Sequence, residues 1–202
     1  MRAKAKQEPT GGFSPHESLP KPQLVLDLCA GTGCVGIALA KEIGCNVIAV
    51  EKSKEALSYL QQNVALNHVE NQVKIIHGDI LDCDLIKTIV NCRFAGSRCE
   101  LSIVHCPSIV INPPYLSKAE MQTLQKEVTH EPETALYGGG DGLDFYRAFF
   151  NLWKNQLKQA RMFACEVGDG QSKQVCRFME EIGLSPKIIK DFNGIARVCY
   201  SV

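Results

Sequence analysis

The chain has 202 residues, of which 45% are hydrophobic and 22% are charged, so it can bury one sizeable core and needs no second domain. Lys plus Arg equal Asp plus Glu at 22 each, which gives no overall basic footprint of the kind that nucleic-acid binding usually demands but does not exclude a local basic patch. The ten cysteines form no Cys-x-x-Cys pair and the five histidines show no metal spacing, so the pattern argues against a zinc site or a disulfide scaffold and indicates free thiols in a reducing compartment.

The first 22 residues mix charged and polar residues with several prolines and show no apolar periodicity, which predicts a flexible lead-in before the folded domain, residues 23–202. Apolar runs of strand length then alternate with amphipathic stretches of helix length. The predicted strands are residues 23–28, 46–50, 73–77, 108–111, 162–167, 185–190 and 196–201, and the predicted helices are residues 34–43, 54–67, 84–92, 142–157 and 171–182.

This alternation is typical of an α/β fold: a doubly wound, mostly parallel, seven-stranded Rossmann-like sheet with helices on both faces. Only residues 191–195 separate the last two strands, so they read as a hairpin that turns the far edge of the sheet antiparallel. No apolar run is long enough for a transmembrane helix, and the N-terminus lacks the apolar core of a secretory signal. We therefore expect a soluble, cytoplasmic protein, or a mitochondrial one if it is a eukaryotic organellar form.

A glycine-rich turn follows the first predicted strand and fits the dinucleotide pattern G-x-G-x-x-G at Gly31, Gly33 and Gly36. Glu51 stands twenty residues after Gly31, at the end of the second strand, where a carboxylate can accept hydrogen bonds from ribose hydroxyls. Asp27, just before the turn, would repel a pyrophosphate but could receive an ammonium group. The turn therefore favours S-adenosylmethionine over NAD.

Polar side chains close four successive predicted strands at Asp27, Glu51, Asp79 and Asn112. Ligands of open α/β sheets collect at the carboxyl ends of the strands, and Asp79 is suited to accept from an adenine amino group. Each carboxylate also has a structural alternative, because Asp27 could stabilise the next helix N-terminus, Glu51 could cap a helix with Ser53, and Asp79 could form a turn. Four such coincidences at one edge favour a ligand site.

The fourth strand leads into Asn112-Pro113-Pro114-Tyr115. The two prolines have fixed φ and push the preceding residues toward extended geometry, so the chain leaves the sheet stiffly with its carbonyls pointing outward. Such a turn can hold acceptors around a planar NH2 group, although an ordinary strand-ending Pro-Pro turn is the alternative. The segment therefore predicts methylation of a planar nitrogen.

These residues resemble the class I S-adenosylmethionine-dependent methyltransferases, and among them the HemK-type protein-(glutamine) methyltransferases that modify peptide chain release factors. The resemblance covers residues 23–202 and is carried by the glycine-rich turn, by the Asn-Pro-Pro-Tyr segment and by several downstream runs. Those runs are Glu131-Pro132-Glu133-Thr134-Ala135-Leu136, residues 138–147 (GGGDGLDFYR), Glu166-Val167-Gly168 with Gln171, and Asp191 with Gly194, Arg197 and Val198.

The resemblance implies methyl transfer to the glutamine amide of the Gly-Gly-Gln loop in a release factor, with S-adenosyl-L-homocysteine as product. It assigns the cofactor site to Asp27, Cys29, Ala30, Gly31, Thr32, Gly33, Glu51, Lys52, Asp79, Ile80 and Asn112. It assigns catalysis to Asn112, Pro113 and Tyr115, and substrate binding to these three with Pro114, Glu131 and Pro132. The Asn112 side-chain oxygen and the Pro113 carbonyl would accept the two amide hydrogens, while Tyr115 would stack on the amide.

The chain departs from the family pattern in three ways. The usual ribose-binding Asp is Glu51, residues 81–106 form a longer link than usual, and only the 22-residue lead-in stands where bacterial members carry an N-terminal helical domain. Two alternatives stay open: methylation of an exocyclic amino group of adenine or guanine in RNA or DNA, and a non-catalytic cofactor-binding module. An NAD-dependent oxidoreductase is the weakest reading, because no hydride-transfer set follows the turn.

Residues 117–147 are expected to cover the site and contact the protein substrate. Three consecutive glycines, Gly138 to Gly140, favour a mobile loop that approaches its neighbours closely, and Glu131 and Pro132 would order the segment before it. A merely structural connection is the alternative. We interpret His130 as a loop residue and not as a base.

Overall fold

The computed structural model describes residues 24–90, 107–124 and 131–202. The predicted flexible lead-in lies outside these ranges, as do His130 and most of the long link that precedes the fourth strand. Among the helices of the described ranges, none is long and apolar enough to cross a membrane.

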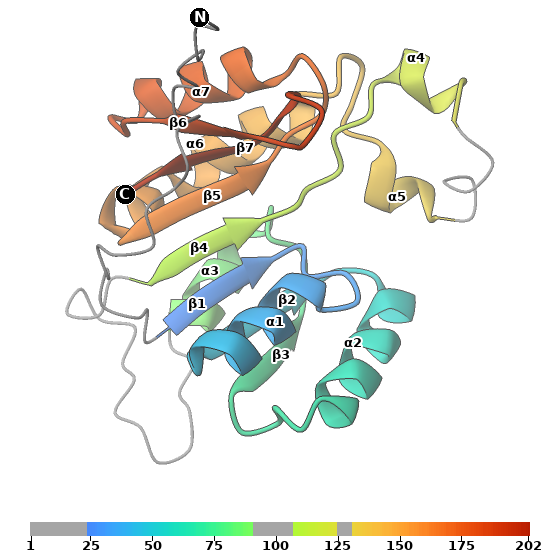
Figure 1. Cartoon of the computed structure of the whole chain (residues 1–202), viewed down its shortest axis with the longest axis vertical. Helices are drawn as coiled ribbons and strands as arrows, with labels where there is room; N and C mark the ends of the chain where they lie inside the picture. The colour runs from blue at the N-terminus through green and yellow to red at the C-terminus, as the bar shows by residue number, and fades with distance from the viewer. Residues whose placement is uncertain (1–23, 91–106, 125–130) are drawn as a thin grey trace, which may run out of the picture.

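Seven strands form one sheet in the order β3-β2-β1-β4-β5-β7-β6 (Figure 1). Strands β1 to β5 are parallel, and β7 lies antiparallel between β5 and β6. The predicted mostly parallel sheet with an antiparallel edge is therefore confirmed. The strands are β1 (Leu24–Leu28), β2 (Asn46–Glu51), β3 (Val73–His77), β4 (Ser108–Ile111), β5 (Met162–Glu166), β6 (Lys187–Lys190) and β7 (Ala196–Ser201).

Five of the seven helices in the described ranges correspond to predicted ones, and two short helices were not predicted. The five are α1 (Cys34–Ile43), α2 (Lys54–Leu66), α3 (Cys83–Val90), α6 (Asp144–Gln159) and α7 (Ser172–Glu181). The short ones, α4 (Lys118–Met121) and α5 (Glu133–Leu136), lie in the segment after β4.

Side-chain alternation along the strands divides the core into two layers. Val25 of β1 and Val47 of β2 pack with α1 and α2 on one face of the sheet. Leu26 and Ile48 point the other way and pack with α3, α6 and α7. Because successive residues of a strand alternate between faces, Asp27 shares the α1 face with Val25.

The chain order reverses direction in the sheet between β1 and β4. From β1, the next two strands extend to one side as β2 and β3, whereas β4 returns to the other side of β1 (Figure 1). Such a switch point opens a crevice at the carboxyl ends of the strands, where open α/β sheets bind their ligands. In this fold that place is the end of β1 beside the end of β4, which are paired up to Leu28 and Ile111.

Candidate active site

The four strand-ending polar residues form a row along one edge of the sheet. Because the strands run in the order β3-β2-β1-β4, the row reads Asp79, Glu51, Asp27 and Asn112 in space, whereas Asp27 comes first in the sequence. Asp27 and Asn112 thus flank the switch point. The sequence could place these residues at one edge but could not give their neighbours.

Asp27 is a buried carboxylate, with 3% of its surface exposed. Its Oδ2 accepts a hydrogen bond from the Gly36 amide of α1 at 2.8 Å. A side chain at position 36 would place its Cβ 2.7 Å from that oxygen, so only glycine lets the helix come this close. Burial is the largest cause that raises the pKa of Asp27 to about 6, and nearby Glu51 adds to it against the Gly36 hydrogen bond.

The glycine-rich turn after β1 is held in an unusual backbone conformation by Glu51. Cys29, Gly31 and Gly33 have φ values of 61°, 56° and 89°. The Gly31 amide donates to Glu51 Oε2 at 2.7 Å, and the Ser53 amide donates to Oε1 at 2.7 Å. Each carboxylate oxygen keeps a second lone pair for another donor. Glu51 therefore orders the turn and can still bind hydroxyl groups.

The remaining members of the turn leave its outer side open. Ala30 is tied to β2, since its amide donates to the Val50 carbonyl at 2.9 Å. Thr32 is exposed, and its carbonyl accepts from the Asn63 side chain of α2. A Cβ at Gly31 would meet no atom of the described residues within 4 Å, which leaves room beside the backbone there.

The loop after β3 brings a third carboxylate to the same edge. Asp79 Oδ1 accepts from the Leu81 amide at 2.9 Å, and Oδ2 forms an ion pair with Lys52 at 2.8 Å. Partial burial raises the pKa of Asp79, but Lys52 and the Leu81 amide outweigh it and hold the pKa below its usual range. Beneath this loop, the buried Trp153 indole donates to the Ile80 carbonyl at 2.8 Å, so α6 supports it.

The half-buried Cys29 thiol lies within reach of the charges at this edge. Burial raises its pKa well above the usual range, and the carboxylates of Glu51, Asp27 and Asp79 raise it further, with Lys52 opposing them. All three carboxylates therefore act on one point beside the turn. A site of this charge suits a cationic ligand and disfavours a pyrophosphate.

The Asn-Pro-Pro-Tyr segment begins where β4 ends. Asn112 is exposed, and its amide makes no hydrogen bond to any residue in the described ranges, whereas Pro113 is buried. The half-buried Tyr115 donates from its hydroxyl to Glu166 Oε1 at 3.4 Å. Burial, followed by the negative charge of Glu166, raises the pKa of Tyr115.

The family-pattern residues after β4 lie around this segment, from distant parts of the sequence. Glu131 is exposed, but its charge also reaches the Tyr115 hydroxyl and raises its pKa, whereas Arg197 lowers it. Pro132 forms the N-cap of α5. Residues 117–147 are thus only partly irregular in the described ranges, and α4 carries a capping box between Ser117 and Glu120.

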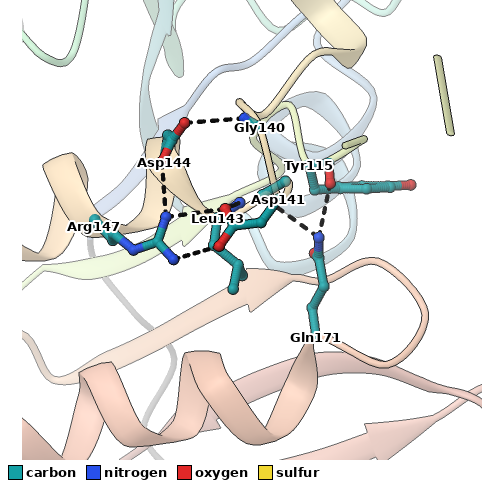
Figure 2. A network of polar contacts seen from close by, with 8 residues as sticks. Tyr115, Gly140, Asp141, Leu143, Asp144, Arg147 and Gln171 are labelled. Atoms are coloured by element: carbon teal, nitrogen blue, oxygen red, sulfur yellow. Dashed lines mark hydrogen bonds and ion pairs between the residues drawn. The ribbon is translucent and has the colours of Figure 1, made fainter. Parts of the chain in front are cut away.

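Sequence reasoning did not anticipate how the segment is held from outside. The Gln171 side chain donates to the Tyr115 carbonyl at 2.8 Å, across 56 residues (Figure 2). A Cβ at Gly138 would lie 2.7 Å from the Tyr115 Cα and 2.8 Å from the Pro114 carbonyl, so this glycine is needed for close approach. Gln171 and the glycines were noted as family pattern, but the pattern gave no sign of this contact.

Comparisons with known proteins show which proteins this chain is similar to. Residues 17–92, which include the glycine-rich turn, match the family model of the TRM5/TYW2 methyltransferase domain. The chain is 32% identical over 177 residues to the release factor glutamine methyltransferase of Thermodesulfovibrio yellowstonii, covering 86% of this chain and 57% of that one. It is 30% identical over 148 residues to the ribosomal protein uL3 glutamine methyltransferase of Francisella tularensis, covering 73% and 42%.

Among solved structures, the human methyltransferase 10 domain containing protein superposes with a TM-score of 0.58 at 15% identity, covering 95% of this chain and 75% of that one. A likeness at this identity concerns the fold alone. The chain spans little more than half the length of the Thermodesulfovibrio relative. By its fold and by these similarities, the chain resembles the class I methyltransferases, and among them the release factor glutamine methyltransferases.

Proposed function

We propose that this domain transfers a methyl group from S-adenosylmethionine to the side-chain amide nitrogen of a glutamine, in the Gly-Gly-Gln loop of a peptide chain release factor. One observation carries the proposal. The charges of Glu51, Asp27 and Asp79 all act on Cys29 at the end of β1, and the exposed Asn112, whose side-chain amide makes no hydrogen bond within the described ranges, follows directly on β4, which pairs with β1. A cationic methyl donor and a planar amide acceptor would therefore meet at the switch point.

The residues present fit the cofactor. Asp27 Oδ1, which makes no hydrogen bond within the described ranges, would receive the ammonium group of the methionine part. Glu51 would accept from the ribose hydroxyls with its remaining lone pairs, and Asp79 would accept from the adenine amino group beside Ile80. Bound there, S-adenosylmethionine supplies a methyl group already activated on a sulfonium centre, and S-adenosyl-L-homocysteine is left as product.

The acceptor side must make a poor nucleophile available. The amide nitrogen of glutamine is weakly nucleophilic because its lone pair is delocalised into the carbonyl. The Asn112 side-chain oxygen and the Pro113 carbonyl would each accept one amide hydrogen, which orients the nitrogen and stabilises positive charge as it develops. Tyr115 would stack on the amide plane. Holding the nitrogen in line provides most of the rate, so no general base is needed for the transfer itself. The nitrogen would form its bond to the methyl carbon as the carbon–sulfur bond breaks, and the N-protonated amide, a strong acid, would then lose one hydrogen as a proton to water.

The choice of a protein glutamine rests on similarity as well as geometry. The two relatives above, which are 32% and 30% identical to this chain over the aligned residues, are named glutamine methyltransferases, one for release factors and one for ribosomal protein uL3. The balanced net charge of the chain also favours a protein over a nucleic acid. The release factor is our choice because Glu131, Pro132 and residues 138–147 follow that family's pattern.

The test incubates the protein with methyl-labelled S-adenosylmethionine and, in parallel, a release factor, ribosomal protein uL3 and total RNA or DNA. We expect label in the release factor, and none in a control release factor whose Gly-Gly-Gln glutamine is replaced by alanine. Label only in uL3 would make uL3 the substrate, which keeps the protein-glutamine assignment but contradicts the choice of a release factor. Label only in nucleic acid would overturn the protein-glutamine assignment.

A further inference from the structure

The Gln171 side chain joins three separate segments next to the Asn-Pro-Pro-Tyr segment (Figure 2). Its Nε2 donates to the Tyr115 carbonyl at 2.8 Å and to the Gly142 carbonyl at 3.3 Å. Its Oε1 accepts from the Gly168 amide at 3.0 Å. The residue itself is the N-cap of α7. One amide group thus links the segment after β4, the glycine loop before α6 and the loop after β5.

The two peptide groups that Gln171 binds are each fixed on both sides. The peptide that carries the Tyr115 carbonyl also carries the Leu116 amide, which donates to the Leu136 carbonyl at 2.8 Å. The peptide that carries the Gly142 carbonyl also carries the Leu143 amide, which donates to Asp141 Oδ1 at 3.0 Å. Neither plane can rotate without breaking two hydrogen bonds.

An ionic network anchors the glycine loop to α6 on its other side. The Arg147 guanidinium contacts both carboxylate oxygens of Asp141 and donates to Asp144 Oδ1 at 2.7 Å (Figure 2). Asp144 Oδ2 in turn accepts from the Gly140 amide at 3.1 Å. The loop against which Gln171 holds Tyr115 is therefore attached to the longest helix in the described ranges.

The Asn-Pro-Pro-Tyr segment is stiff and is held at both of its ends, so these contacts decide its geometry. At one end, Ile111 pairs with Leu28 of β1 and with Cys165 of β5. At the other end, Gln171 fixes the Tyr115 peptide. Pro113 and Pro114 between them have fixed φ, so the direction of the Pro113 carbonyl follows from where the two ends are held.

We infer that Gln171 is a positioning residue for methyl transfer: it holds the far end of the Asn-Pro-Pro-Tyr segment, so that the acceptors of Asn112 and Pro113 keep the geometry that the substrate amide needs. The inference rests on the proposed function, since it concerns the same acceptor site. Gln171 lies on the side of Tyr115 that faces α7 and the glycine loop, and within the described ranges its side chain makes no hydrogen bond to Asp27, Glu51 or Asp79.

The test is Q171M, which removes both donors and the acceptor while keeping the length of the side chain. The matched control is Q174M, one turn along α7, where the glutamine side chain makes no hydrogen bond to a described residue. We expect kcat for the release factor to fall about 10- to 100-fold in Q171M, because a displacement near 1 Å of a positioned group costs about this much. The Kd for S-adenosylmethionine should stay within about twofold, and Q174M should change neither.

A second readout does not depend on the substrate. Hydrogen exchange at the Leu116 and Leu143 amides should be about tenfold faster in Q171M and unchanged in Q174M. If the wild-type protein transfers no label to any glutamine, the proposed function fails, and the exchange result alone decides whether Gln171 holds the segment. Should Q171M not fold, Q171E decides in both readouts, since it keeps the acceptor for Gly168 and replaces the donor by a carboxylate oxygen that repels the Tyr115 and Gly142 carbonyl oxygens.

Two outcomes would overturn the inference. A kcat within twofold of wild type would show that the acceptor geometry does not need Gln171. An equal loss of S-adenosylmethionine affinity and of thermal stability would show that Gln171 supports the whole fold and not the acceptor segment.

Discussion

Asp27 is a buried carboxylate at a place where the fold gains little from a negative charge. Its pKa is raised to about 6, chiefly by burial, so the ionised form is disfavoured in the folded protein. The proposed reason is functional: a desolvated carboxylate attracts the ammonium group of the cofactor more strongly than an exposed one. We therefore expect ionised Asp27 to lower the stability of the free protein and to raise its affinity for S-adenosylmethionine. Each effect can be measured separately.

The variant D27N tests the effect of Asp27 on stability. A carboxyl group whose pKa is higher in the folded than in the unfolded protein binds protons preferentially when folded, so it destabilises at high pH and not below its unfolded pKa. From the shift, ionised Asp27 costs about 3 kcal/mol above pH 6. Urea unfolding should show D27N up to about 3 kcal/mol more stable than wild type at pH 8, with the difference shrinking as pH falls through 6 toward 4. The control is D169N, at an exposed position after β5, where the substitution removes a carboxylate without changing a buried group.

The same variant, D27N, tests the effect of Asp27 on the affinity for S-adenosylmethionine. Calorimetry at pH 8 should show D27N binding S-adenosylmethionine about 10- to 100-fold more weakly, as expected for loss of a buried charge partner. Wild-type affinity should decrease as pH falls below about 6, because Asp27 must be ionised to bind a cation, and D27N should lack this dependence. Unchanged affinity in D27N would remove Asp27 from the cofactor site.

For Asn112 we expect the opposite pattern, in which the catalytic rate falls and the affinity for S-adenosylmethionine hardly changes. N112A removes one acceptor for the substrate amide, so kcat should fall about 100- to 1,000-fold, the cost of losing one group that stabilises developing charge. The Kd for S-adenosylmethionine should stay within about threefold. N151A, on an exposed turn of α6, is the control and should change neither value. Equal loss of both would make Asn112 a cofactor ligand instead of an acceptor.

At the level of elements, the sequence predicted the longer helices, whose ends depend on neighbouring residues, but not the shortest ones. The α1 bounds, Cys34–Ile43, agree with the sequence because glycines at 33 and 44 adopt left-handed φ values at both ends. The α6 helix begins at Asp144, two residues later than expected, because Gly142 has a φ of 76°. The four-residue α4 and α5 were missed, since so short a helix depends on its surroundings, although Ser117 and Glu120 show a readable capping box.

The helix α6 supports the cofactor edge through one buried hydrogen bond, from the Trp153 indole to the Ile80 carbonyl. W153F leaves that carbonyl unpaired and a cavity beside it, so the free energy of unfolding should fall by about 2–4 kcal/mol. The loop that carries Asp79 should also loosen, which lowers S-adenosylmethionine affinity about three- to tenfold. In F150L, from the same core cluster, stability should fall while affinity stays within about twofold. Unchanged affinity in W153F at measured destabilisation would mean that the loop needs no support from α6.

At the level of the whole molecule, the strands of the sheet could be predicted from the sequence, but their order in the sheet could not. Apolar runs identified every strand, yet the return of β4 to the side of β1 is a tertiary choice with no local signal. That choice places Asn112 beside Asp27 and not beside Asp79. The contact of Gln171 with Tyr115, across 56 residues, was hidden for the same reason. The residues at the strand ends could be predicted from the sequence, whereas their neighbours in space are visible only in the structure.

Net charge is also a property of the whole molecule, and it separates the protein substrate from the nucleic-acid alternative. Binding to RNA or DNA depends on phosphate neutralisation, and a protein with 6–10 phosphate contacts loses about 10³- to 10⁵-fold in affinity between 50 and 200 mM salt. This chain has 22 basic and 22 acidic residues, and three carboxylates lie at the β1 to β3 side of its candidate site. Fluorescence anisotropy with a labelled RNA hairpin should give a Kd weaker than about 10⁻⁴ M at 150 mM salt, with less than a tenfold change over that range. Release factor binding measured in the same buffers is the control, and tight, steeply salt-dependent RNA binding would instead favour an exocyclic amino group of a nucleobase as the methyl acceptor.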